Sequence, residues 1–323
     1  MISAGICKHS ELFSAKWLVL PGTSAGFGLF SKEINKRYRS GKISELLGKN
    51  SNVFSLRGNS RLAGLLSLTR LSWDSKYFGI GMAEIRALSC SGLDVVATEQ
   101  KNILLTLAAD FCRQKNIKHI SVKIDPDDFS GISSLENNGF RLMGSRLTYV
   151  LNFKRVSLPE FTDLCRIREF KKSDVPGLLE LARRYAPRDS RFSLDHHLPS
   201  ERSKNFYVEW IKNACRGKFA DGVLVAERNK KVVGFATYKF NSGLKRLAGI
   251  RCIHRGLLVV SPEGRGASFS LFRELRRHAM SSFGAESGEW VLNNFNYPMI
   301  RILRRIGASF VNMEYVFHKW VDQ

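Results

Sequence analysis

The chain has 323 residues, 44% of them hydrophobic and 25% charged, and this composition is that of an ordinary globular protein with one or two buried cores. It excludes a disordered chain, a collagen-like repeat and a small disulfide scaffold. Lys and Arg number 51 against 29 Asp and Glu, a formal net charge of +22. This excess favours anionic partners: phosphate-bearing small molecules, nucleic acid or an acidic membrane surface.

The six cysteines lack the spacing of a metal or redox site, because no two form a CxxC pair and none has a histidine nearby at ligand spacing. We therefore expect free thiols in a reducing compartment, and no metal. No uncharged run approaches the roughly 18 to 20 residues that span a bilayer. The sequence predicts a cytoplasmic protein without a transmembrane segment, and it leaves the choice between monomer and homodimer open.

The first 50 residues are the hardest part to interpret. Residues 21–28 (PGTSAGFG) are rich in turn-forming residues and contain a GxG, but no strand–loop–helix pattern surrounds them, so we assign them no function. We treat 1–50 as a segment of unclear role, followed by a degenerate N-terminal lobe at 51–158 and a C-terminal domain at 162–323.

From residue 101 onward the same order of elements occurs twice. Helix, strand, helix and strand are expected first at 101–114, 119–124, a stretch ending before Gly139, and 147–153, and again at 268–283, 288–292, a stretch ending before Gly307, and 315–320. Gly139 and Gly307 lie 168 residues apart, close to half the chain length, which indicates a duplicated α/β unit. Each glycine directly follows a helical pattern, where a left-handed C-cap residue is expected.

The second copy has further elements upstream of its repeat. We expect a strand at 166–170, helices at 174–185 and around 205–215, a hairpin of 222–227 with 232–240, and a strand at 250–260. The hairpin turns at Asn229, Lys230 and Lys231.

One stretch carries chemistry. The strand ending at Val260 is followed by SPEGRGASFS (261–270), which runs straight into a helix. A strand, a glycine-containing turn and a helix N-terminus together present free backbone N–H groups and the positive end of a helix dipole to an anion, commonly a pyrophosphate. Arg265 adds a cation. On its own the stretch is equally consistent with an ordinary Pro-Glu-Gly turn.

With this order of elements around it, the stretch resembles the Arg-Gly loop of the GCN5-related N-acetyltransferase (GNAT) superfamily. Asn296 fits the same pattern, seven residues before Leu303, which is itself four before Gly307. Two further runs are similar to the bacterial dTDP-fucosamine acetyltransferases: NFYVEWIKNACRGKF (205–219) and LSWDSKYFG (71–79). The resemblance runs from about residue 66 to the C-terminus.

The resemblance implies an α/β (α+β) fold of tandem GNAT-like lobes, with mixed, mostly antiparallel sheets flanked by helices and a complete second lobe. It implies acetyl-CoA as donor, bound where the fourth and fifth strands of the second lobe separate. Because only this lobe has the Arg-Gly loop, we expect one donor site. Its expected residues are the loop positions and their neighbours on the adjoining strands: Arg265, Gly266, Ala267, Ser268, Phe269, Ser270, Leu258, Val260 and Asn296.

The sequence departs from the family pattern at two places. Ser268 and Ser270 fill loop positions usually taken by Gly or Ala, and a serine there adds a hydroxyl that can donate to phosphate. Leu303 stands where the family commonly has a Tyr that protonates the departing thiolate. A thiolate leaves with little acid assistance, so we expect a slower enzyme, with water or Tyr297 in place of that Tyr.

Several residues are candidates for proton transfer and acceptor binding. His254 lies on the strand that leads to the separation, and imidazole titrates near neutral pH, so it is the first candidate for general base. Glu289, on the next strand, is the second. The histidine and aromatic candidates can also have a purely structural role, the histidines as surface residues and the aromatic residues as packed side chains. The candidates for the acceptor site are Arg191, His196 and His197 in the second half and Trp73, Asp74 and Phe78 in the first.

These features predict an N-acetyltransferase that acts on a primary amine. We expect this amine to be an amino group of a nucleotide-linked (dTDP-type) deoxyamino sugar for cell-surface glycan synthesis. Two alternatives stay open. The +22 charge is compatible with a tRNA-dependent aminoacyltransferase of the same tandem fold, although nucleic acid is not the favoured partner. The Leu303 departure permits a non-catalytic protein that keeps a CoA or polyphosphate site.

Overall fold

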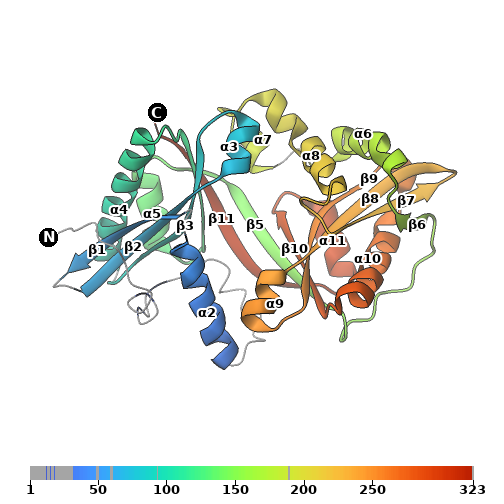
Figure 1. Cartoon of the computed structure of the whole chain (residues 1–323), viewed down its shortest axis with the longest axis horizontal. Coiled ribbons are helices and arrows are strands. Elements are labelled where there is room, and N and C mark those ends of the chain that lie inside the picture. The colour runs from blue at the N-terminus through green and yellow to red at the C-terminus, as the bar shows by residue number, and fades with distance from the viewer. Residues whose placement is uncertain are drawn as a thin grey trace. The chain divides into compact units, whose positions relative to one another are not determined.

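Figure 1 shows a computed structural model of the chain. The structure describes residues 12, 15, 18, 32–48, 51–58, 61–92, 94–187 and 190–321, so the turn-rich stretch at 21–28 lies outside the described residues. The chain forms two compact units. Unit 1 comprises residues 1–146 and 313–323, and unit 2 comprises residues 147–312.

Unit 1 is a sheet with strand order β1-β2-β3-β4-β11. The β3–β4 pair is parallel, and the other neighbouring pairs are antiparallel. Helices α4 and α5 pack on one face of this sheet, and α2 packs on the other. The elements are α2 (Lys32–Leu46), β1 (Ser51–Gly58), β2 (Arg61–Arg70), α3 (Ser72–Phe78), β3 (Met82–Cys90), α4 (Asp94–Gln114), β4 (His119–Ile124) and α5 (Phe129–Asn137).

The last strand of unit 1 comes from the far end of the chain. β11 (Ser309–Trp320) pairs with β4, with Tyr315 opposite Ile124 and Trp320 opposite His119. The strand that follows α5 in sequence, β5 (Arg141–Asn152), lies instead beside β10 of unit 2. The final strand of each sequence copy therefore completes the sheet that the other copy begins.

Unit 2 has strand order β5-β10-β9-β8-β7-β6, and only the β10–β9 pair among its described pairings is parallel. Its remaining elements are β6 (Arg166–Glu169), η1 (Lys172–Asp174), α6 (Val175–Tyr185), α7 (Arg191–Leu194), α8 (Ser200–Cys215), β7 (Gly222–Arg228), β8 (Lys231–Phe240), α9 (Ser242–Ala248), β9 (Cys252–Val260), η2 (Pro262–Gly264), α10 (Ala267–Phe283), β10 (Ser287–Asn293) and α11 (Tyr297–Arg305).

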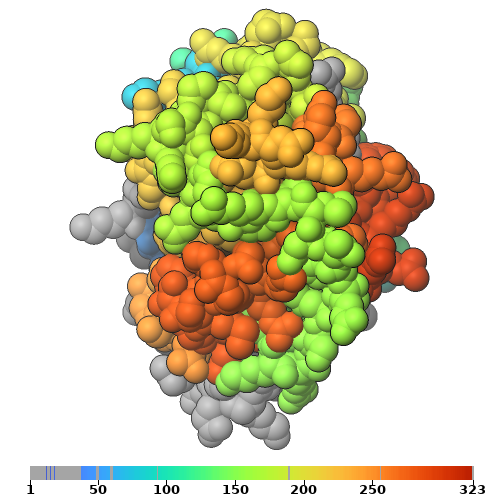
Figure 2. Space-filling view, turned by 90° about the vertical axis from the view of Figure 1, so that its right-hand side faces the viewer, coloured from blue at the N-terminus to red at the C-terminus, as the bar shows by residue number. Residues whose placement is uncertain are grey.

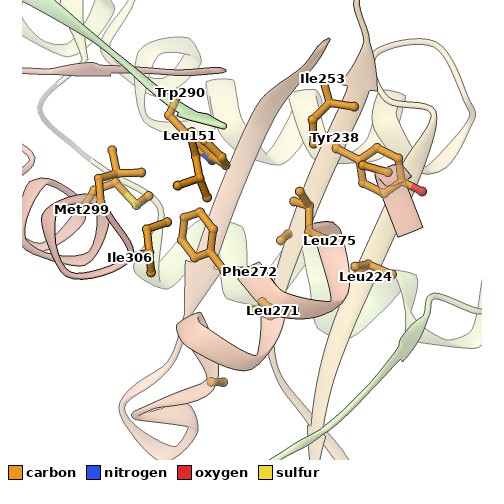
Figure 3. Close-up of a cluster of buried hydrophobic side chains, with 14 of the residues drawn as sticks. Leu151, Leu224, Tyr238, Ile253, Leu271, Phe272, Leu275, Trp290, Met299 and Ile306 are labelled. Carbon is orange, nitrogen blue, oxygen red and sulfur yellow. The ribbon is translucent and has the colours of Figure 1, made fainter. Parts of the chain in front are cut away.

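The sheet of unit 2 is buried on both faces. On one face, Leu271, Phe272 and Leu275 of α10 pack against strand residues that include Trp290 and Leu151 (Figure 3). The opposite face packs against α6 and α8, through strand residues such as Phe235 and Leu257. Because successive side chains of a strand point to opposite faces, these strands read as nearly continuous apolar runs.

The α/β fold class is confirmed, and the predicted elements occur in the predicted order, with the short helices α7 and α9 in addition. β4 has the predicted bounds, and Gly139 and Gly307 have φ of 74° and 79°, the left-handed conformation expected after a helix. The hairpin turn is also confirmed, with positive φ at Asn229 and Lys230.

Several predicted boundaries are wrong: α4, β5 and β11 begin at residues 94, 141 and 309, earlier than the predicted 101, 147 and 315. The strand expected from residue 250 begins at Cys252, and the short helix α9 precedes it. The Asn241 side chain caps α9 by accepting a hydrogen bond from the Leu244 N–H at 2.9 Å, and Gly249 ends it at φ 74°. A helix of 7 residues is too short to show a periodic pattern, so only these capping residues could have indicated it.

Two further observations concern the described residues only. The five described cysteines are free thiols. None of the described helices is both long and apolar enough to cross a membrane.

Candidate active site

Two neighbouring strands of unit 2 separate halfway along their length. β9 and β10 pair in parallel from Cys252 with Ser287 to His254 with Glu289, and no pairing is recorded beyond that point. β9 stays paired with β8 on its other side as far as Val260. One edge of β9 therefore turns its backbone N–H and C=O groups toward the space that opens between the two strands.

A cavity of about 490 Å³ occupies this space. β9 and β10 form its walls, the first turn of α10 and the start of α11 close its sides, and Tyr185, Pro187 and Tyr207 line it as well. Four of the predicted donor-site residues meet here: Leu258, Val260, Ser268 and Asn296. The sequence analysis missed Tyr207, although this residue lies within the run at 205–219.

A bulge in β9 shapes the edge of the cavity. The register between β8 and β9 shifts between Ala236 and Tyr238, so that Gly256 and Leu257 together face Thr237. The fully buried Thr237 hydroxyl accepts a hydrogen bond from the Leu257 N–H at 2.8 Å. A β-carbon on Gly256 would lie 2.4 Å from the Trp210 ring, so only glycine fits there. No sequence motif pointed to Thr237.

The loop after β9 ends in a helix N-terminus without a side-chain cap. Gly266 is the N-cap residue of α10, its φ is 95°, and it makes no capping side-chain hydrogen bond. This left-handed conformation favours glycine. The loop also needs Gly264, because a β-carbon there would lie 2.6 Å from the Val233 carbonyl oxygen. Arg265 is exposed between these glycines, so the loop offers backbone N–H groups and one cation to an anion.

The two loop serines differ in their surroundings. Ser268 lines the cavity. Ser270 is fully buried, and its hydroxyl donates to the Asp163 carboxylate at 2.8 Å, so the expectation that this hydroxyl donates to phosphate is wrong. Hydrogen bonds from Arg273 and Ser270 hold the pKa of Asp163 below its usual value. In Figure 2 the green segment that contains Asp163 runs beside the orange surface of α10.

A histidine and a carboxylate lie where the strands separate. His254 Nδ1 and Glu289 Oε1 are 2.9 Å apart, and the two residues are cross-strand partners. The His254 side chain is 42% exposed and that of Glu289 15%. When Nδ1 donates to the carboxylate, Nε2 of the neutral ring is left as a proton acceptor. The structure thus brings the two base candidates together as one pair.

The thiol beside this pair is not reactive. Burial raises the pKa of Cys252 to about 12, so the thiol stays protonated near neutral pH. A thiolate is the nucleophilic form of cysteine, which argues against a covalent intermediate on this residue.

The residues at the start of α11 have distinct positions. Asn296 is the N-cap residue, and its side-chain oxygen accepts from the Met299 N–H at 3.2 Å. Tyr297 is 61% exposed, so its hydroxyl is accessible. Leu303 is fully buried in the core beneath α10. Its side chain has no proton to give, so Tyr297 and water remain as the sources of one.

A second cavity of about 580 Å³ adjoins the first, because Pro187 and Tyr207 line both. It lies among α6, α7 and α8, and its lining includes Phe192, the cations Arg183 and Lys204, and the predicted acceptor residue His196. Arg191 and His197 are not among its lining residues. The Arg191 guanidinium lies 4.5 Å from the Phe192 ring centroid, and the His197 N–H donates to Asp195 at 3.2 Å.

The acceptor candidates in the first half of the sequence lie on α3 of unit 1. Phe78 is 2% exposed and packs edge-on against Tyr77, so its predicted contact with substrate is wrong and the core interpretation is right. Trp73 stacks on Tyr77 with ring centroids 5.2 Å apart, and Asp74 lies in the first turn of the same helix.

A parallel strand pair that separates around a cavity, a glycine-containing loop into a helix N-terminus, and a second copy of the same element order define the class: this is the tandem GNAT fold. Solved structures agree. A tandem GNAT protein from the clavulanic acid biosynthesis pathway is similar with TM-score 0.55 and 12% identity, over 97% of this chain and 94% of that one. A GCN5-related N-acetyltransferase from Sphaerobacter thermophilus gives TM-score 0.57 and 13% identity, over 86% and 85%.

Sequence comparison points to one particular relative. The dTDP-fucosamine acetyltransferase of Escherichia coli O6:H1 is 26% identical over 159 residues, which is 49% of this chain. The match spans 61% of the length of that relative. No family model matches the chain. The predicted fold and the predicted resemblance to GNAT acetyltransferases are thus confirmed.

Proposed function

We propose that unit 2 is an N-acetyltransferase that takes its acetyl group from acetyl-CoA. The observation that carries this proposal is the cavity between β9 and β10, which runs along an unpaired strand edge and reaches the first turn of α10 at Ser268. A long, partly peptide-like thioester with a pyrophosphate fits such a site. The strand edge offers hydrogen bonds to its amides, and the helix N-terminus offers N–H groups to its phosphates.

The residues present fit each part of this donor. Amides of the stretch from Arg265 to Ser270 hold the pyrophosphate, apart from those of Arg265 and Phe269, which donate to the Pro262 and Gly266 carbonyls. The Arg265 side chain adds a charge-assisted contact. The backbone of Leu258 and Val260 pairs with the pantetheine arm, and one N–H of this edge stabilises the negative charge that develops on the thioester oxygen. Asn296 contacts the pantetheine from the start of α11.

His254 acts as general base, and Glu289 orients it. The reaction forms a bond from the acceptor nitrogen to the acetyl carbon and breaks the carbon–sulfur bond. An alkylammonium acceptor loses one proton before attack, which His254 Nε2 passes to solvent, and a second as the amide forms, which ends on the leaving sulfur. Proton transfer by a placed group contributes about 10²- to 10⁴-fold.

Tyr297 or a water molecule supplies the proton to the sulfur. The thiol pKa of about 8.5 makes a thiolate an adequate leaving group without strong acid assistance. The exposed Tyr297 hydroxyl stands in for the acid that Leu303 cannot be.

The acceptor is the amino group of a nucleotide-linked deoxyamino sugar. Two observations support this substrate class: the similarity to a dTDP-fucosamine acetyltransferase, and the second cavity, which adjoins the first at Tyr207. Its lining offers an aromatic ring at Phe192, suited to a base, and the cations Arg183 and Lys204, suited to phosphates. Each of these cations is in an exposed ion pair with a glutamate of its own helix, which a phosphate would have to replace. His196 lines the same cavity and contacts the acceptor there.

A thiol-release assay with acetyl-CoA tests this function. We expect free CoA thiol with at least one amine in a panel of nucleotide-linked amino sugars, and mass spectrometry should show one added acetyl group on that sugar. Arg265→Glu should weaken acetyl-CoA binding, and Arg277→Glu, an exposed arginine further along α10, is the matched control. Failure of acetyl-CoA both to bind and to release thiol with every amine would refute the proposal.

A further inference from the structure

An arginine outside the cavity lies where the donor site continues toward solvent. Pro298 and Ile302 of α11 line the cavity. Arg305 follows Ile302 by three residues, so it lies on the same face of the helix, one turn further on. Its guanidinium carbon is 5.0 Å from the ring centroid of Phe269, in the first turn of α10. The end of α11 therefore reaches the helix N-terminus that we assign to the pyrophosphate.

The guanidinium of Arg305 lies at one end of a stack in which two phenylalanine rings stand between two arginines. The Phe269 and Phe161 ring centroids are 5.6 Å apart, and the Arg273 guanidinium lies 5.2 Å from the Phe161 centroid. A guanidinium stacked on a ring keeps its N–H groups pointing sideways, free to donate in a fork to a phosphate. The stack thus holds Arg305 in place before any ligand arrives.

The two arginines of the stack differ in their ion pairs. Arg273 pairs with the Asp163 carboxylate. Within the described part of the chain, Arg305 has no carboxylate at ion-pair distance, and it is exposed. Its charge is therefore available to an anion.

We propose that Arg305 binds the 3′-phosphate of CoA and makes this protein select CoA over dephospho-CoA. The inference rests on the proposed donor site. The 3′-phosphate is a monoester that lies beyond the pyrophosphate on the nucleotide end of the donor. Of the arginines of α11, Arg305 is the one that stacks on Phe269 in the first turn of α10, and a dianionic monoester matches its planar fork. A donor whose phosphopantetheine is attached to a carrier protein lacks this group and is disfavoured.

The test compares CoA with dephospho-CoA by titration calorimetry on the full chain. The wild-type protein should bind CoA at least about tenfold more tightly than dephospho-CoA, which is the usual effect of a charge-assisted contact. Arg305→Met keeps an aliphatic stem on Phe269 and should weaken CoA binding about tenfold while leaving dephospho-CoA unchanged. Arg304→Met, at the neighbouring exposed position, is the control and should change neither affinity.

The outcomes separate the two claims. Arg305 also lies in the last turn of α11, where a cation stabilises the helix end, but a purely structural role would weaken both ligands equally or neither. Equal wild-type affinity for the two ligands, or an equal loss of both in Arg305→Met, overturns the selectivity and leaves the donor site intact. Absence of binding of either ligand to wild type overturns the proposed function as well.

Discussion

The two units have the same strand separation but different interiors. In unit 1, β3 and β4 pair in parallel from Met82 with His119 to Ile85 with Val122, and no pairing is recorded beyond that point, as between β9 and β10 in unit 2. The cavity at this separation is about 40 Å³ in unit 1 and about 490 Å³ in unit 2. The fold therefore provides the same opening twice, and side chains decide whether a ligand enters it.

A partly buried ion pair lies beside the separation in unit 1, where its aspartate lines the small cavity. Lys101 of α4, whose side chain is 5% exposed, lies 2.5 Å from Asp128, the N-cap residue of α5. The same lysine donates to the Ser130 hydroxyl at 2.9 Å. In unit 2 the corresponding N-cap residue is the uncharged Asn296, and α10 contributes Ser268 to an open cavity.

The charges around the two separations also differ in sign. Three carboxylates, Asp125, Asp128 and Glu314, line the small cavity of unit 1 together with the cations Arg86 and Lys123, and burial together with the neighbouring carboxylates raises the pKa of Asp125. The exposed arginines Arg265 and Arg305 flank the first turn of α10 in unit 2. The carboxylates of the first arrangement repel phosphates and the arginines of the second attract them, which supports the proposed donor site in unit 2.

Removing the base should produce the largest effect. His254→Gln is expected to lower kcat by about 10²- to 10⁴-fold with an unchanged Kd for acetyl-CoA, because the imidazole acts on the acceptor proton and makes no contact with the phosphates. Glu289→Gln should cost less, about tenfold, since the imidazole remains and only its orientation is loosened. Steady-state kinetics with the acceptor found in the screen measures both. An unchanged kcat in His254→Gln contradicts the assignment.

Filling the open cavity should make unit 2 resemble unit 1. Ser268→Trp places an indole in the cavity and is expected to weaken acetyl-CoA binding by about 100-fold, measured by calorimetry, with little change in melting temperature. Ser282→Trp, at an exposed position near the end of the same helix, is the matched control and should bind normally. Normal binding by Ser268→Trp would show that the donor lies elsewhere.

Breaking the ion pair of unit 1 should affect stability and leave the donor site untouched. Lys101→Met leaves the Asp128 carboxylate without its partner and is expected to cost about 2 kcal/mol in unfolding free energy, measured by urea denaturation. Lys101→Met with Asp128→Asn removes both charges, keeps a good N-cap residue and should recover part of that loss. Acetyl-CoA affinity should stay at the wild-type value in both variants; a change in it would mean that unit 1 takes part in donor binding.

The smallest expected effect is on the pH dependence of folding stability, through the ion pair at the start of α6 in unit 2. Arg168 donates to Asp174 and to Glu227, and its hydrogen bond to Asp174 holds the pKa of that carboxyl below its usual value. A lowered folded-state pKa stabilises the protein above the unfolded value of about 3.9, and this contribution disappears as pH falls through the folded pKa. Asp174→Asn should therefore lose about 1 kcal/mol at pH 7 and show a flatter stability profile below pH 4. A parallel shift of the whole profile would contradict this cause.

Much of the fold could be predicted from local patterns in the sequence. The helix ends at Gly139 and Gly307, the hairpin turn and the Arg-Gly loop all depend on residues close together in the chain, and each is found as predicted. The pairing of β11 with β4 depends on contacts between strands about 190 residues apart, which no local pattern encodes.

The candidate site was only partly predictable for the same reason. Leu258, Val260, Ser268 and Asn296 follow from the family pattern, and they line one cavity. The predictions for Ser270 and Phe78 were wrong because residues far away in the sequence decide whether these side chains are buried. Ser270 is held by Asp163, and Phe78 is buried in unit 1. The Lys101–Asp128 ion pair could not be predicted from the sequence for the same reason, because its residues belong to two different helices.

Hydrogen exchange with and without saturating acetyl-CoA can show which unit binds the donor, because it reports on both strand separations in one experiment. If the donor binds to unit 2 alone, the backbone amides at 256–270 and at the start of α11 should exchange more slowly, with no change at 84–101 in unit 1. Equal protection of the two regions, or protection at 84–101 alone, would contradict the assignment of a single donor site to unit 2.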